Sequence, residues 1–146
     1  MKRNMLSVFI LFVALFGAIS IRAVEPARVT VYYFHGTFRC PSCHRIEQYT
    51  KGALDEYFGA DLRSGKLIYE VINLEEEGNE HFVRDYELYT KSVVLSLVEN
   101  GKEIKYKNLD KVWQYLGDKR KFYDYIDSET RSFLEELKEK EKDATW

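Results

Sequence analysis

Apolar residues change their spacing along the chain, and each spacing predicts one kind of element. The stretch 27–35 is β-branched and aromatic almost throughout, which is typical of a buried central strand. Apolar residues then recur at three- and four-residue steps over 43–57, which predicts one face of a helix. The alternating stretch 67–74 predicts a second strand, and 79–91 predicts a short helix.

The second half of the chain predicts a hairpin followed by helices. The apolar runs 93–98 and 102–106 flank an Asn-Gly pair at 100–101, which is the strongest short-range signal for a hairpin turn. Helical spacing resumes at 110, and a Gly-Asp pair at 117–118 precedes a long last helix. The element order β-α-β-α-β-β-α predicts an α/β fold with parallel first strands and an antiparallel hairpin.

The amino terminus is a leader-like segment, apolar on all sides and preceded by positive charge. A Lys-Arg pair at 2–3 precedes an apolar run over 5–21, and Ala-Ile-Ser at 18–20 matches a cleavage site. The run is also at the short end of what spans a bilayer, roughly 17–25 residues. We therefore expect 1–23 to be a signal peptide or a membrane anchor. Residues 24–146 then form one exported domain, periplasmic or extracytoplasmic, held at the inner membrane if the leader stays.

Composition indicates one globular domain and excludes one class of partner. The chain has 146 residues, of which 45% are hydrophobic and 32% charged, enough for a single core. Its net charge is -2 at pH 7, without the basic excess that nucleic-acid binding requires. We therefore expect no nucleic-acid partner.

Both cysteines of the chain, Cys40 and Cys43, lie in the string FRCPSCHRI. A Cys-x-x-Cys pair is typical of a dithiol/disulfide redox site, and Cys-x-x-Cys-His of a haem attachment site. Pro41 suits the first position of the predicted helix, which makes Cys40 the cap residue. Unpaired N–H groups and the helix dipole stabilise a thiolate there. We therefore predict that Cys40 is the nucleophile, with a lowered pKa, and that Cys43 is the resolving thiol.

Four neighbours of the two cysteines complete the candidate site. Pro41 and Ser42 separate the cysteines, and Arg39 and His44 flank them. A cation that pointed toward the sulfurs would add positive potential and favour the thiolate. Export also favours redox chemistry, because disulfides persist outside the cytoplasm. A purely structural bridge over so short a loop would contribute only about 2 kcal/mol.

Two stretches resemble the thioredoxin superfamily. Its first strand, active-site loop and second helix are similar to VTVYYFHGTFRCPSCHRIE, and its following strand, short helix and hairpin to INLEEEGNEHFVRDYELYTKSVVLSLVENGKE. The resemblance covers roughly residues 28–116 in element order and spacing. It implies a thioredoxin-like fold with a long C-terminal helix, Cys40 as nucleophile and Cys43 as resolving cysteine.

A narrower resemblance involves the aromatic-rich stretch YKNLDKVWQYLGDKRKFYDYI. This stretch resembles the exported ArsF-type thioredoxin-like proteins, which are often labelled nitrophenyl compound nitroreductase subunits. The chain has no flavin or nicotinamide fingerprint, so nothing in it indicates that kind of reductase chemistry.

Three positions depart from the superfamily's pattern. The tryptophan before the first cysteine is Arg39, and the buried acid of the first strand falls at Phe34. The cis-proline before the third strand falls at Val93, after Ser92, and the two prolines of the chain lie elsewhere. In the superfamily that proline packs beside the disulfide and keeps metals off the sulfurs. Without it, the two sulfurs could bind a soft metal or a cluster.

Two alternatives remain open for the cysteines. A c-type haem electron carrier would use Cys40, Cys43 and His44, but it needs a second axial ligand, and both methionines lie in the leader. A metal-holding accessory protein without turnover would add His35 or His44 to the two sulfurs. We favour an exported thiol–disulfide oxidoreductase without a cofactor or metal. Its expected partners are exported protein thiols and disulfides or a membrane redox partner.

Overall fold

The computed structural model of the protein describes residues 25–143, so the leader expected at 1–23 lies outside the described residues. The elements follow one another in the predicted order, which confirms the α/β fold class. They are β1 (Arg28–His35), α2 (Pro41–Ser64), β2 (Leu67–Asn73), α3 (His81–Asp85), β3 (Ser92–Glu99), β4 (Lys102–Asn108), the 3-10 helix η2 (Asp110–Val112) and α4 (Lys119–Asp143). No helix within 25–143 is long and apolar enough to cross a membrane.

The strands form one sheet in the order β2-β1-β3-β4. β1 runs parallel to β2, with Val29 opposite Leu67, and antiparallel to β3, with Tyr33 opposite Val93. β3 and β4 form the expected antiparallel hairpin, and Asn100 in its turn has a φ of 54°. The strands therefore pair as the sequence predicts. The carboxyl end of β1 lies on an inner strand, between β2 and β3.

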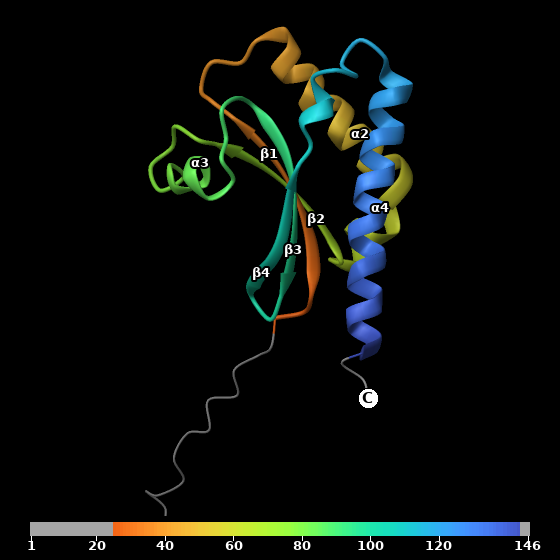
Figure 1. Ribbon diagram of the computed structural model, residues 1–146. Helices are drawn as coiled ribbons and strands as arrows, with labels where there is room; N and C mark the ends of the chain where they lie inside the picture. Colours follow the sequence, from red (N-terminus) through yellow and green to blue (C-terminus); the bar gives the residue numbers. More distant parts are fainter. Residues whose placement is uncertain (1–24, 144–146) are drawn as a thin grey trace, which may run out of the picture.

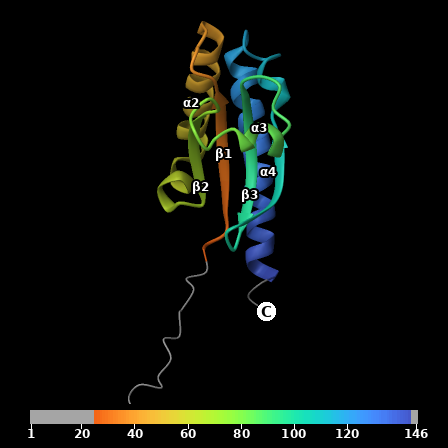
Figure 2. The same cartoon turned by 90° about the vertical axis from the view of Figure 1, so that its left-hand side faces the viewer.

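Helices cover the two faces of the sheet unequally (Figure 1). α2 and α4 lie side by side against one face, whereas the short α3 lies against the other. The turned view in Figure 2 shows α2 and α4 extending along the strands. Alternate residues of β1 divide between the faces, because successive side chains of a strand point to opposite sides. Val29, Val31 and Tyr33 belong to the core under α2 and α4, and Tyr32 and Phe34 pack on the α3 side.

The helix predicted over 79–91 is wrong in its second half. α3 ends at Asp85, and the chain continues as a loop into β3. Glu87 in this loop has a φ of 51°, outside the helical range. Leu88, which follows it, is 7% exposed and packs with the α3-side cluster. Burial of this side chain holds the loop against the sheet, which overrides the local helical preference.

Candidate active site

Cys40 and Cys43 lie where the chain passes from β1 into α2. Cys40 has extended backbone angles (φ -77°, ψ 165°) and is the N-cap of α2, and Pro41 lies in the first helical turn. The Cys43 N–H donates to Cys40 Sγ at 3.3 Å, and the His44 N–H donates to the Cys40 carbonyl at 3.2 Å. The Cys40 sulfur therefore caps the helix and lies among N–H groups that have no partner within the helix.

The two sulfurs differ in exposure and in acidity. Cys40 is partly exposed and Cys43 is fully buried, and both are free thiols. A hydrogen bond from the Cys43 thiol, together with the one from its backbone N–H, lowers the pKa of Cys40 below the ordinary thiol value. Burial raises the pKa of Cys43, and its hydrogen bond to Cys40 raises that pKa further. The outer sulfur therefore ionises before the inner one, which is the asymmetry that a nucleophile and a resolving thiol require.

Tyr33, rather than Phe34, is the β1 residue that contacts Cys43. Its hydroxyl donates to the Cys43 carbonyl at 2.7 Å, and burial raises the pKa of Tyr33 to about 12, so the phenol stays neutral. Phe34 points to the opposite face, where its ring centre lies 5.2 Å from that of Phe82. The expectation that Phe34 occupies the place of a buried acid is therefore wrong, since neighbouring residues of a strand face opposite sides. β1 carries no carboxylate that could take a proton from Cys43.

Arg39 and His44 flank the cysteines in different ways. Arg39 forms an ion pair with Glu47 of α2, and its guanidinium carbon lies 5.8 Å from the centre of the Tyr33 ring. Its charge is therefore balanced, and the side chain ties the cysteine loop to the helix. His44 is exposed on α2, and Ser42 between the cysteines is partly buried.

Two side-chain hydrogen bonds hold the loop that leads into β3. Ser92 Oγ donates to the Thr90 carbonyl at 2.9 Å, and Trp113 Nε1 donates to the Lys91 carbonyl at 3.0 Å. Val93, the position where a proline was expected from the resemblance, is fully buried in the core. Residues 25–143 contain no cis peptide bond. The loop is therefore fixed by hydrogen bonds, and the helical spacing after 110 gave no sign that Trp113 takes part.

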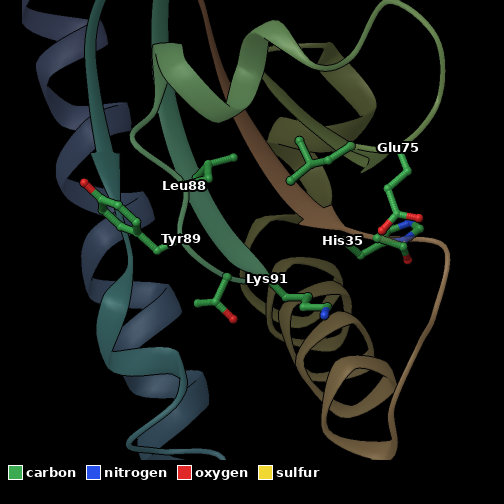
Figure 3. A pocket seen from close by; sticks show the side chains of 8 residues that line it. His35, Glu75, Leu88, Tyr89 and Lys91 are labelled. Carbon is green, nitrogen blue, oxygen red and sulfur yellow. The ribbon is translucent and has the colours of Figure 1, made fainter.

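A pocket of about 180 Å³ opens between this loop and the carboxyl ends of β1 and β2 (Figure 3). Its residues are His35, Gly36, Leu74, Glu75, Leu88, Tyr89, Thr90 and Lys91. Opposite charges, from Glu75 and Lys91, line it together with the His35 imidazole. His35 Nδ1 lies 2.8 Å from the Gly36 carbonyl and donates to it, because a carbonyl only accepts.

Glu75 joins this pocket to the loop that carries the cysteines. The Thr37 N–H donates to Glu75 Oε2 at 3.1 Å. Hydrogen bonds from the Thr37 side chain and backbone lower the pKa of Glu75 below its usual range. The two residues are 38 positions apart, so local sequence patterns could not reveal the contact.

The haem and metal alternatives lack ligands in the described part of the chain. Within 25–143, no group of three or more His, Cys, Asp or Glu side chains could hold a metal ion. His35 ends β1, His44 is exposed on α2, and His81 begins α3 with its Nδ1 2.8 Å from the Gly78 carbonyl. The metal alternative would therefore need a third ligand, and the haem alternative a second axial ligand, from outside the described residues.

No family model matches the sequence, and no curated protein matches it. Solved structures that match the fold include thioredoxins. Oxidized thioredoxin O2 from Arabidopsis thaliana is 13% identical, with a TM-score of 0.39 over 66% of this chain and 76% of that one. Fasciola hepatica thioredoxin is 17% identical, with a TM-score of 0.38 over 62% and 79%. An Entamoeba histolytica thioredoxin mutant is 18% identical, with a TM-score of 0.41 over 69% and 81%.

These matches limit what similarity can say about the chain. At such identities the likeness concerns the arrangement of the fold, and the chemistry rests on the two cysteines themselves. No match supports the narrower resemblance to ArsF-type proteins or their nitroreductase label.

Proposed function

We propose that the protein is an exported thiol–disulfide oxidoreductase. The observation that carries this proposal is the cap geometry, in which the Cys43 N–H lies 3.3 Å from Cys40 Sγ. It is supported by the partial exposure of Cys40 and the complete burial of Cys43. This arrangement supplies an accessible thiolate and a second thiol close enough to displace whatever binds to it.

The exchange takes place in two displacement steps. The Cys40 thiolate attacks one sulfur of a partner disulfide, the partner's S–S bond breaks, and its other sulfur leaves as a thiolate. Cys43 loses its proton and attacks Cys40 Sγ. A Cys40–Cys43 disulfide forms, the mixed disulfide breaks, and the partner leaves reduced by two electrons. The same steps in reverse oxidise a partner dithiol, and the reduction potential of the two cysteines sets the direction.

Mutation of each cysteine separately tests the exchange in the full-length chain. With Cys43→Ala, Cys40 should accumulate mixed disulfides with protein or small-molecule thiols, because no second thiol can release them. The matched Cys40→Ala variant should accumulate far fewer, since its remaining sulfur is buried. The wild-type cysteines should cycle between thiol and disulfide in glutathione buffers of graded potential, read by mass shift after alkylation. Wild-type cysteines that never cycle would rule out the enzyme function.

The proposed location and partners follow from the leader. The positive pair at 2–3 and the apolar run at 5–21 would direct the domain across a membrane, by a signal peptide or an anchor. The partners are then exported protein thiols and disulfides or a membrane redox protein. Fractionation of a C-terminally tagged full chain in a bacterial host should find the tag outside the cytoplasm, and deletion of 5–21 should keep it inside. A tag that stays inside in both cases would refute export.

A further inference from the structure

The resolving step requires a thiolate at a position that disfavours one. Cys43 is fully buried, and burial raises its pKa. Its neighbour on β1 is Tyr33, a neutral hydroxyl that donates to the Cys43 carbonyl and cannot take up a proton. Stabilisation of the Cys43 thiolate must therefore come from another element.

Lys91 is the cation placed to provide it. The charged or titratable groups near Cys43 are Cys40 on α2, Tyr33 on β1 and Lys91 on the loop before β3, and the positive charge of Lys91 favours the ionised form of Cys43. Arg39 is the other cation of the cysteine loop, but its charge is paired with Glu47. Lys91 therefore differs from Arg39 in having no ion pair of that kind at the start of α2.

The pocket and the loop fix where the Lys91 ammonium lies. Figure 3 shows its side chain extending from the loop toward the side of the pocket that His35 and Glu75 form. The Lys91 side chain is partly buried, and Trp113 Nε1 holds its carbonyl at 3.0 Å. His35 and Glu75 lie at the far wall, where Glu75 is already engaged by the Thr37 N–H. The ammonium is therefore held between the pocket and the buried thiol.

We propose that Lys91 assists the resolving step by stabilising the Cys43 thiolate as it attacks the Cys40 sulfur of the mixed disulfide. This inference rests on the proposed function and names a residue that acts through Cys43. The proton of Cys43 leaves to water through the pocket before the attack. The electron pair of Cys43 then forms the new S–S bond, and the partner sulfur departs with the pair from the bond that breaks.

A neutral aromatic disulfide separates the two steps in time. When the reduced full-length chain reacts with 2,2′-dithiodipyridine, attack by Cys40 releases one thiopyridone and attack by Cys43 releases a second. A neutral probe avoids direct attraction between Lys91 and the reagent. Stopped-flow absorbance then gives a rate for each release at every pH.

The Lys91→Gln variant should slow the second release relative to the first. Each tenfold loss of Cys43 thiolate slows attack by about threefold, because a more basic thiolate is also a better nucleophile. The pH profile of the second release should move to higher pH, and Lys91→Arg should restore it. The control is Lys102→Gln, an exposed lysine at the opposite end of β3 that should change neither release.

The outcomes distinguish the inference from the proposed function. If neither thiopyridone is released from the wild-type chain, Cys40 is inert and the proposed function fails. If both are released and Lys91→Gln leaves the second rate and its pH profile unchanged, the role of Lys91 is wrong while the proposed function stands. Equal slowing by Lys91→Gln and Lys91→Arg would also overturn the inference, because it would indicate packing rather than charge.

Discussion

Two tyrosines on the α2 side of the sheet should respond in opposite directions to the same chemical change. Tyr33 on β1 donates its hydroxyl to the Cys43 carbonyl at 2.7 Å. Tyr69 on β2 has a buried hydroxyl without a hydrogen-bond partner in the described part of the chain. Replacing either residue by Phe removes one oxygen atom and leaves the ring in place.

The expected magnitudes follow from the contacts of the two hydroxyls. A buried hydrogen bond contributes about 0.5–1.5 kcal/mol net, so Tyr33→Phe should lower the free energy of unfolding by about 1 kcal/mol. For a domain of this size that corresponds to a Tm lower by roughly 3–6 °C. An unpaired buried polar group costs about 1–3 kcal/mol, so Tyr69→Phe should raise the free energy of unfolding by about 1 kcal/mol.

Urea unfolding of the reduced full-length chain at pH 7 measures both changes, with the m-value checked for constancy. Reducing conditions keep a Cys40–Cys43 disulfide from contributing to the measured stability. The assignment of Tyr33 as the residue that anchors the start of α2 would be refuted if both variants lost the same stability. It would equally be refuted if Tyr33→Phe were neutral.

Three further variants test the surroundings of the cysteines. Cys43→Ala removes the hydrogen bond that lowers the pKa of Cys40 most, so the pH midpoint of Cys40 alkylation by iodoacetamide should rise; an unchanged midpoint would contradict this cause. Trp113→Phe removes the N–H that holds the Lys91 carbonyl, and the second thiopyridone release should slow less than in Lys91→Gln; no slowing would show that the hydrogen bond is dispensable. Glu75→Gln should destabilise the protein at neutral pH. Because the folded-state pKa of Glu75 is lowered, its contribution is present above the ordinary carboxyl pKa and is lost as the pH falls through the lowered value. Urea unfolding of wild type and variant should therefore converge in acid, and a difference that persists there would contradict the electrostatic cause.

The elements that depend on neighbouring residues could be predicted from the sequence. The strand at 27–35, the hairpin around its Asn-Gly turn and the cap at Cys40 each follow from backbone and side-chain preferences within a few positions. The helix over 79–91 was predicted too long, because burial of Leu88 against the sheet outweighs the helical preference of the residues after Asp85. Local patterns do not contain that long-range contact.

Order along the chain, the pairing of the strands and the place of Cys40 before a helix were determined by the sequence alone. Tertiary packing decided that Tyr33 contacts Cys43 while Phe34 faces α3, since which side of a strand is covered depends on where the helices pack. It also brought Glu75 to Thr37 and Trp113 to Lys91, contacts that join residues 38 and 22 positions apart. Such contacts form only once the sheet has placed its loops at one edge, and so the chemistry around the buried thiol depends on the folded chain as a whole.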